Sequence, residues 1–313
     1  MQQNTDSTSI HSLNADLGLN RLQAVLYFAL NHLNNAFPNY SVDRQLKNFQ
    51  FTAFNLQEHW SVSPNNSSPS RKLSDLFWLS LPWERIKAEL GEISVLDIGC
   101  GSGGYGKRLA EWSNSRIANY IGLDINQHAN WEQLSQNYGF HFYAKNVCDF
   151  PIEKLENTNL LISQSSLEHI AEDLSIFRRI QQYVRAYKKS IIQIHLIPSS
   201  ACLRLYRLHG IRQYTPRTAS KIFAMFKSNA YGILFGLGGK ACCDLHDEFI
   251  TKPAEQSQPD RRTLYPEEYN QRLRHAVELD MKTSEQYPAF YALVIHSNFK
   301  SRLFEELAGE PQN

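Results

Sequence analysis

Three glycines at alternate positions follow a short apolar segment that contains one carboxylate. The segment is Val95-Leu96-Asp97-Ile98, and the glycines are Gly99, Gly101 and Gly103. Because glycine has no Cβ and tolerates positive φ, such a turn lets a ligand approach the backbone closely. A helix that begins just after the turn can point its free N–H groups at the same ligand. The pattern therefore predicts a site for a nucleotide-like cofactor.

The loop spacing leaves two kinds of cofactor open. Gly99, Gly101 and Gly104 satisfy G-x-G-x-x-G, and Asp124 lies 20 residues further on, where dinucleotide-binding folds place a ribose-binding acid. A turn or helix N-cap role would also explain Asp124. Asp97 favours a different cofactor, because a carboxylate beside the loop would repel a pyrophosphate. It suits a cofactor that carries an ammonium group and a sulfonium.

The segment from Asp97 to Gly103 resembles the first motif of the class I S-adenosylmethionine-dependent methyltransferases, and the likeness continues along the chain. Tyr120–Ile125 is similar to the family's second strand, whose terminal acid binds both ribose hydroxyls. Asp149 takes the place of the family's adenine-binding acid, although alone it would be interpreted as a turn residue. The resemblance implies S-adenosyl-L-methionine as cofactor. The residues expected at its site are Asp97, Gly99, Gly101, Gly103, Asp124, Ile125, Cys148, Asp149 and Gln164.

The resemblance also implies an α/β fold, a Rossmann-like doubly wound sheet of seven strands in the order 3-2-1-4-5-7-6 with the last strand antiparallel. The residue pattern agrees, since apolar segments alternate with amphipathic ones. The last two strands are predicted near 231–239 and 290–297. A hairpin needs only a few residues between them. The longer connection predicts a substrate-side insert at about 240–286.

The remaining regions are assigned from composition and periodicity. Residues 1–16 are polar and are expected to be disordered, and residues 301–313 form a C-terminal tail. The methyltransferase domain is expected over 91–300. Residues 17–90 are predicted to form a helical extension, which would either shape the substrate pocket or only pack against the sheet. Its apolar residues at helical spacing are Leu22, Val25, Leu26, Phe28, Ala29 and Leu33.

Composition limits the class of protein. The chain has 313 residues, 42% of them hydrophobic and 20% charged, as in ordinary globular proteins. Its net charge of +1 gives no general attraction to nucleic acid. No signal-peptide pattern or membrane-spanning apolar run is visible. Five cysteines without framework spacing favour reduced thiols and a cytoplasmic protein, and no obligatory protein partner is indicated.

Methyl transfer from a sulfonium is an in-line displacement, so holding the acceptor in line is the main task of the protein. A hydroxyl acceptor also needs a base. Candidates follow or lie in the fourth and fifth strands, where ligands of open α/β sheets bind. These are His169, beside Glu168, and His195. His169 would otherwise be a helix-start residue that shapes the pocket, and His195 a core histidine.

A metal is not expected. Some relatives bind a divalent ion through a Glu-x-x-Glu-His arrangement, but Ser165 occupies the position of the first glutamate here. Cys242, Cys243, Asp244 and His246 do not match a usual zinc spacing either.

The segment from 203 to 227 bears on the acceptor. It holds six basic residues and no acidic one: Arg204, Arg207, Arg212, Arg217, Lys221 and Lys227. Arginine forks suit phosphate or carboxylate, which would fit an anionic acceptor such as an activated sugar. A solvated helix face, or contact with a membrane surface, would also explain them.

The sequence thus predicts a methyltransferase acting on a small-molecule or glycan-precursor acceptor. Oxygen is the favoured acceptor atom, because Gln164-Ser165-Ser166-Leu167 stands where amino-group methyltransferases of bases carry Asn-Pro-Pro-Tyr. Three alternatives remain open at this point: a macromolecular (RNA or protein) methyltransferase, a nicotinamide-dependent oxidoreductase, and a protein that binds the cofactor without turnover.

Overall fold

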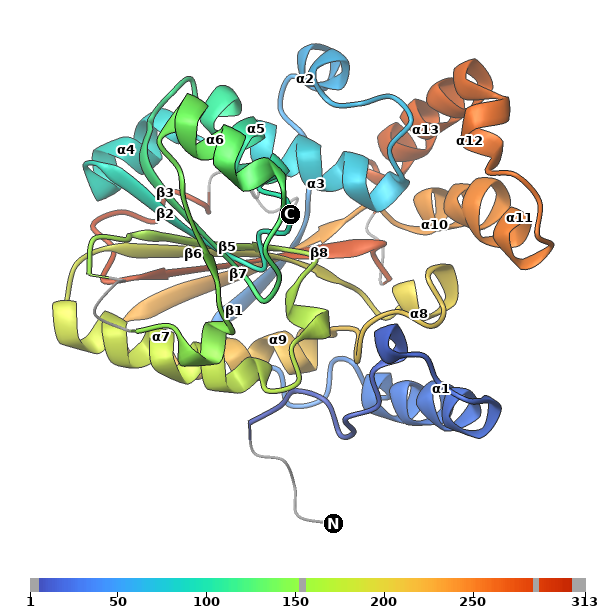
Figure 1. Ribbon diagram of the computed structural model, residues 1–313, viewed down its shortest axis with the longest axis horizontal. Helices are drawn as coiled ribbons and strands as arrows, with labels where there is room; N and C mark the ends of the chain where they lie inside the picture. The colour runs from blue at the N-terminus through green and yellow to red at the C-terminus, as the bar shows by residue number, and fades with distance from the viewer. Residues whose placement is uncertain (1–5, 152–155, 284–286, 306–313) are drawn as a thin grey trace.

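The computed structural model describes residues 6–151, 156–283 and 287–305, and its centre is an eight-stranded sheet with helices on both faces (Figure 1). The strand order is β1-β7-β8-β6-β5-β2-β3-β4. The strands are β1 (Leu46–Gln50), β2 (Ile93–Ile98), β3 (Ile117–Asp124), β4 (His141–Ala144), β5 (Leu160–Gln164), β6 (Ile191–Pro198), β7 (Ala230–Leu237) and β8 (Phe290–Ser297).

Seven of these strands follow the predicted order. Numbered from β2, the series β4-β3-β2-β5-β6-β8-β7 is 3-2-1-4-5-7-6, and β8 runs antiparallel to both β6 and β7. The count of seven is wrong, because β1 pairs in parallel with β7 at the sheet edge. Its sequence, Leu-Lys-Asn-Phe-Gln, is short and half exposed, so it carries little strand signal.

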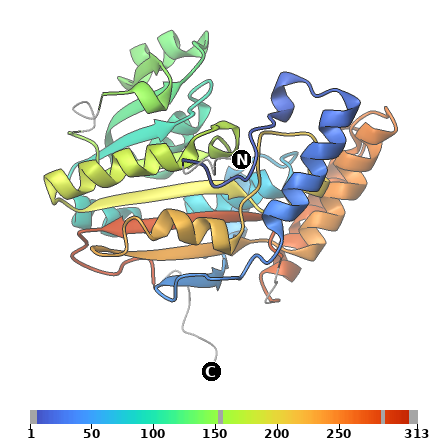
Figure 2. The same ribbon diagram turned by 90° about the horizontal axis from the view of Figure 1, so that it is seen from below.

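The helices form two layers, as a doubly wound sheet requires. Alternate residues of β2 show why: Val95 packs with the core on one face, whereas Leu96 and Ile98 pack with the core on the other. Figure 2 shows helices α7 and α9 lying along the second face. The first face is covered by α3 (Pro69–Leu79), α4 (Trp83–Leu90), α5 (Gly104–Trp112) and α6 (Asn130–Tyr138), and the second by α7 (Asp173–Tyr187) and α9 (Pro216–Phe223).

The insert between the last two strands is helical and packs beside α3 (Figure 1). Phe249, Tyr269 and Leu273 from this insert are buried in the same core as α3. Its elements are α10 (Lys240–His246), a π-helical turn (Asp247–Thr251), α11 (Lys252–Glu255), α12 (Arg261–Leu264) and α13 (Pro266–Asp280).

The N-terminal segment differs from the prediction of disorder. Ser7, Thr8 and Ser9 are buried, and the 3₁₀ turn η1 (Ala15–Leu17) is held by the bond from Ala15 N–H to the carbonyl of Gly210 (2.9 Å). Polar side chains make contacts here that hydrophobic patterning does not reveal. Residues 1–5 lie outside the described part of the chain.

Helix α1 (Arg21–Asn35) forms where the extension was predicted, but it packs through the opposite face. Leu22 and Val25 of the expected apolar face are 78% and 68% exposed. The buried residues are polar: Tyr27 donates to the carbonyl of His209 (2.8 Å) and Asn31 to that of Ile211 (3.3 Å). The extension also contains α2 (Leu56–Val62), besides α3, α4 and β1.

The C-terminal tail is packed over its described part, since Leu303 and Phe304 are buried against the first-face core. Residues 306–313 lie outside the described residues. No helix within the described ranges has both the length and the apolar character that crossing a membrane requires.

Candidate cofactor and acceptor sites

A cavity of about 540 Å³ lies at the carboxyl ends of β2, β3, β4 and β5, and we call it the glycine-loop cavity. Its walls come from the glycine loop, from residues 123–126 after β3, from residues 145–147 after β4 and from residues 165–171 after β5. Parallel strands all end on this edge, which is where open α/β sheets bind ligands. One site is therefore assembled from four separate segments.

Backbone bonds fix the glycine loop. The N–H groups of Gly99 and Cys100 donate to the carbonyl of Leu123 (2.8 and 2.9 Å), and Trp131 Nε1 donates to the carbonyl of Gly101 (2.8 Å). Gly101 has a φ of +54°, and a Cβ built on it would meet no atom within 4 Å. The side of Gly101 that a Cβ would occupy is open, as close approach of a ligand to the backbone requires.

Asp124 stands at the centre of this cavity. Its Oδ2 accepts from the N–H of Gly101 (2.9 Å) and its Oδ1 from the N–H of Asn126 (2.9 Å). A carboxylate has about four lone-pair sites, so two remain for a ligand's hydroxyls. Asp124 thus holds the loop and also faces the space where a ribose is predicted.

The predicted cofactor residues fall into two groups. Gly99, Gly101, Asp124 and Ile125 line the glycine-loop cavity. The other five predicted residues do not line this cavity: Asp97, Gly103, Cys148, Asp149 and Gln164. Asp149 is exposed at the end of the 3₁₀ turn Val147–Asp149, and the wall after β4 is instead formed by Lys145, Asn146 and Val147. Ser166 also lines the cavity and was missed, since a serine in a loop carries no distinct signal.

Asp97 lies beneath the loop and is 1% exposed. Its Oδ2 accepts from the hydroxyl of Tyr120 (2.6 Å), whereas Oδ1 is buried without a hydrogen-bond partner among the described residues. Burial raises the pKa of Asp97 to about 7, and the Tyr120 bond opposes that rise. A cationic group bound nearby would stabilise the ionised form. Asp97 does not line the glycine-loop cavity, so its contact with the cofactor stays a prediction.

Gly103 has a structural role. Its φ is +78°, and a Cβ would lie 2.8 Å from both Leu134 Cδ1 and Phe142 Cε1. Gly139 has a similar φ of +69° but open space around it. We expect both alanine substitutions to cost about 1–2 kcal/mol for the left-handed backbone, and Gly103→Ala to cost about 1–3 kcal/mol more from overpacking. Urea denaturation of both variants checks this, and equal losses would contradict it.

A second cavity of about 300 Å³ lies under the N-terminus of α3, and we call it the α3 cavity. Its polar wall includes Ser68, Ser70 and Ser74, and the Ser70 hydroxyl bonds to that of Tyr206. Gln164 lines this cavity instead of the cofactor site, and its Oε1 accepts from Trp78 Nε1 (2.9 Å). The two cavities share Ser165 and His169. Their contents therefore meet at these two residues.

A cluster of titratable residues stands at this junction. Glu168, His169 and His209 each offer one ligating atom, and these atoms all lie within 4.8 Å of one another. His169 Nδ1 is 2.6 Å from Asp16 Oδ2. Burial raises the pKa of Glu168 to about 7, against the opposing effect of His169. Asp16 and His209 were not predicted, because they lie far from 168–169 in sequence.

The third predicted catalytic residue, His195, lies elsewhere. It is 0% exposed within β6, its Nδ1 lies 2.8 Å from Ser163 Oγ, and its ring meets that of Phe177 edge-on. Burial lowers the pKa of His195 to about 3. His195 lines neither cavity, so it is positioned as a core histidine and cannot reach an acceptor in either cavity.

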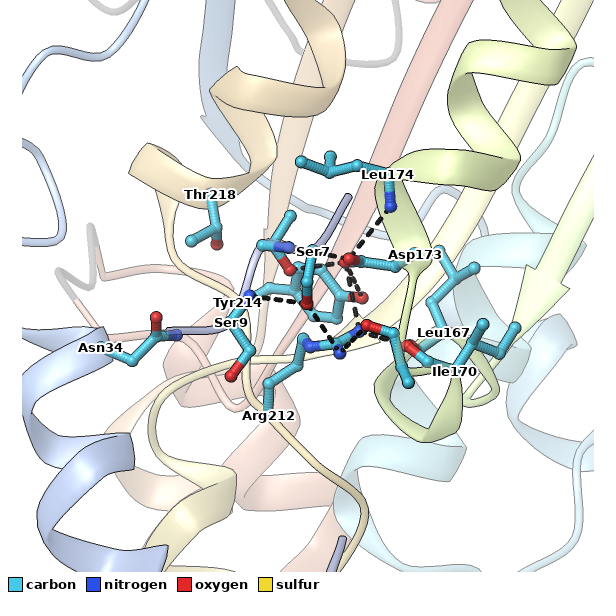
Figure 3. A network of polar contacts seen from close by, with 12 residues as sticks. Ser7, Ser9, Asn34, Leu167, Ile170, Asp173, Leu174, Arg212, Tyr214 and Thr218 are labelled. Atoms are coloured by element: carbon cyan, nitrogen blue, oxygen red, sulfur yellow. Dashed lines mark hydrogen bonds and ion pairs between the residues drawn. The ribbon is translucent and has the colours of Figure 1, made fainter. Parts of the chain in front are cut away.

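A buried polar network fixes the 3₁₀ turn η4 (Leu167–His169) that carries this cluster (Figure 3). Arg212 is 1% exposed and donates to the carbonyls of Leu167, Ile170 and Ala171 (3.2, 2.6 and 2.8 Å). Its guanidinium lies 3.3 Å from Asp173 Oδ2. Asp173 in turn accepts from Thr8 and Tyr214, which ties the N-terminal segment to the same point.

The basic segment is mostly neutralised within the protein. Four of its six cations pair with carboxylates: Arg204 with Asp247, Arg207 with Glu255, Arg212 with Asp173 and Lys227 with Asp43. Arg217 donates to the carbonyl of Asn34. These contacts involve five of the six cations, and binding of an anion by this segment stays a prediction.

Residues 90–204 match a family model described as a methyltransferase domain. No curated protein matches the chain. The matching solved structures include the plantazolicin methyltransferase BpumL with a desmethylPZN analog and SAH, at 12% identity and a TM-score of 0.46, covering 88% of this chain and 98% of that one.

Two further solved structures match this chain with lower TM-scores. The Burkholderia thailandensis 1,6-didemethyltoxoflavin-N1-methyltransferase is 13% identical with a TM-score of 0.39, covering 70% of this chain and 78% of its own. A Mesorhizobium loti S-adenosylmethionine-dependent methyltransferase is 13% identical with a TM-score of 0.40, covering 68% and 95%. At these values the likenesses add no support of their own.

The family match spans the glycine loop, Asp124 and the turn after β5, and the seven core strands have the order that the class I motifs imply. The nicotinamide alternative is therefore set aside. The chain carries a class I S-adenosylmethionine-dependent methyltransferase domain, and S-adenosylmethionine is its cofactor.

Proposed function

We propose that the enzyme methylates an oxygen of a small-molecule or glycan-precursor acceptor bound in the α3 cavity. One observation carries this proposal: the α3 cavity meets the glycine-loop cavity at Ser165 and His169. Methyl transfer needs the acceptor atom about 3 Å from the methyl carbon. An acceptor in one cavity and a cofactor in the other would meet at this junction.

The size and lining of the α3 cavity favour a small polar acceptor. Its volume of about 300 Å³ is at the lower end of ligand pockets. Three serines, Tyr206 and the junction residues supply hydrogen-bonding groups. A macromolecular acceptor would call for an unpaired basic surface. The pairing within 203–227 argues against such a surface there.

Arg71 favours an anionic group on the acceptor. It lines the α3 cavity, and its guanidinium stacks on the ring of Tyr105, with 5.0 Å between the guanidinium carbon and the ring centroid. An arginine guanidinium binds carboxylate and phosphate groups well. Arg71 is therefore our candidate for binding an anionic group of the acceptor.

The bound cofactor supplies a methyl group on a sulfonium. The protein's contribution is orientation: the loop at Gly99–Gly103 and Asp124 hold one partner, while the α3 wall holds the other. Gly99 packs tightly under Ser166, whose hydroxyl donates to the carbonyl of Ile98 (2.5 Å). This contact joins the glycine loop to the turn after β5. Both halves of the site are therefore fixed relative to each other.

Isotope transfer tests the proposal. Purified protein and methyl-labelled S-adenosylmethionine are incubated with cell extract separated into small-molecule, glycolipid, RNA and protein fractions. We expect label in the small-molecule or glycolipid fraction, a marked loss for Arg71→Ala, and little change for the surface control Arg204→Ala. Calorimetry should show S-adenosylhomocysteine binding in all three proteins. Label in RNA or protein would support a macromolecular methyltransferase. Binding of S-adenosylhomocysteine without methyl transfer to any fraction would support a protein that binds the cofactor without turnover.

A further inference from the structure

Against the expectation from sequence that no metal binds, we propose that Glu168, His169 and His209 hold a divalent first-row transition-metal ion at the junction of the two cavities. The ion site itself rests only on these residues. The further idea that this ion binds and activates the acceptor oxygen rests on the proposed function.

The geometry of the three side chains fits one ion. Their ligating atoms lie within 4.8 Å of one another. Carboxylate and imidazole ligands stand about 2.0–2.2 Å from such ions, so two ligands of one ion are at most about 4.4 Å apart. Side-chain movements of a few tenths of an ångström therefore close the site.

Glu168 lacks the partner that its burial demands. It is 1% exposed, and its Oε2 has no hydrogen-bond partner among the described residues. The closest cationic candidate is the imidazole of His169, with Nε2 3.9 Å from Oε1. Buried carboxylates are normally paired or coordinate metals. A divalent ion between Glu168 and the two histidines would supply the missing charge.

Asp16 provides the outer support typical of metal-binding histidines. Its Oδ2 lies 2.6 Å from His169 Nδ1, which leaves Nε2, on the side of Glu168, free to ligate. Its Oδ1 accepts from the N–H of Gly210 (3.1 Å), next to His209. Tyr27 donates to the carbonyl of His209 (2.8 Å). The N-terminal segment and α1 thus fix both histidines.

The donor set indicates the class of metal. Two imidazoles and one carboxylate suit Mn²⁺, Fe²⁺, Co²⁺, Ni²⁺ or Zn²⁺, whereas Mg²⁺ and Ca²⁺ prefer oxygen ligands alone. Three protein ligands leave positions open for water or substrate. All three residues line the α3 cavity, so those positions face the proposed acceptor.

An ion there would select acceptors with two neighbouring oxygens, such as vicinal hydroxyls or a hydroxyl beside a carboxylate, since both can ligate. It would lower the pKa of the bound hydroxyl, as it does for bound water. The hydroxyl proton passes to water, and the oxygen forms a bond to the methyl carbon. The carbon–sulfur bond breaks with its electron pair passing to sulfur, which leaves neutral S-adenosylhomocysteine.

Titration of the full chain tests the site. Protein stripped with a chelator is titrated by calorimetry with Mn²⁺, Zn²⁺ and Mg²⁺. We expect one Mn²⁺ or Zn²⁺ per chain and weaker Mg²⁺ binding. Asp16→Asn should weaken binding about 10–100-fold, as loss of an outer-shell partner does, and His209→Ala and Glu168→Gln should weaken it further. The exposed His275→Ala serves as control and should bind like the wild type.

Binding of S-adenosylhomocysteine to each variant shows that it is folded and separates the two proposals. If that ligand binds but no Mn²⁺ or Zn²⁺ does, or if the Asp16, His209 and Glu168 variants bind metal as the wild type does, the metal site is wrong and the methyltransferase proposal stands. Loss of metal in these variants with ligand binding retained supports the site.

Discussion

Arg212→Ala is expected to lower the free energy of unfolding by about 3–5 kcal/mol, because it leaves the buried Asp173 carboxylate without its ion-pair partner. The same change removes the donors to the carbonyls of Leu167, Ile170 and Ala171. Those carbonyls flank Glu168 and His169, so the turn that meets both cavities should loosen as well. Urea denaturation measures the first effect and acceptor methylation the second.

The exposed Arg204 provides a matched control from the same basic segment. Its ion pairs are at the surface, so Arg204→Ala should cost at most about 1 kcal/mol. If Arg212→Ala fails to fold, Arg212→Lys retains the charge and gives a measurable loss. Combining Arg212→Met with Asp173→Leu should cost less than the sum of the two single changes, since no charge is left unpaired. Additive losses would contradict the ion-pair account.

Asp124→Ala is expected to weaken S-adenosylmethionine binding by about 1.5–3 kcal/mol, which is a roughly 10- to 150-fold increase in Kd. Two causes act together. The predicted bonds to the ribose hydroxyls are lost, and the N–H of Gly101 loses its acceptor, so the glycine loop is less firmly held. Isothermal titration with S-adenosylmethionine and S-adenosylhomocysteine measures the change.

The control for this prediction is Asp244→Ala, which removes an exposed carboxylate on α10 outside both cavities. Its Kd should equal that of the wild type. Asp124→Asn keeps an oxygen for the Gly101 N–H and should recover part of the loss. An Asp124→Ala protein with unchanged affinity would show that another residue binds the ribose.

Local sequence predicted the glycine loop and Asp124, whereas five of the nine predicted cofactor residues lie outside the glycine-loop cavity. Strand, glycine turn and helix at 93–112 are consecutive in the chain, and the turn depends on positive φ values that glycine adopts most readily. The strand order followed from the resemblance carried by those motifs. The eighth strand, β1, was missed because an edge strand has only one partner and a weak pattern.

The sequence by itself determined that a glycine turn beside Asp97, with Asp124 at the next strand end, suits S-adenosylmethionine. Only the tertiary structure decided which side chains line the α3 cavity and its junction with the glycine-loop cavity. Arg71 and His209 line the α3 cavity from α3 and from the segment after β6, and Asp16 of η1 contacts His169. Buried polar contacts such as the pair of Asp173 and Arg212 hold distant segments together, and hydrophobic periodicity does not register such contacts.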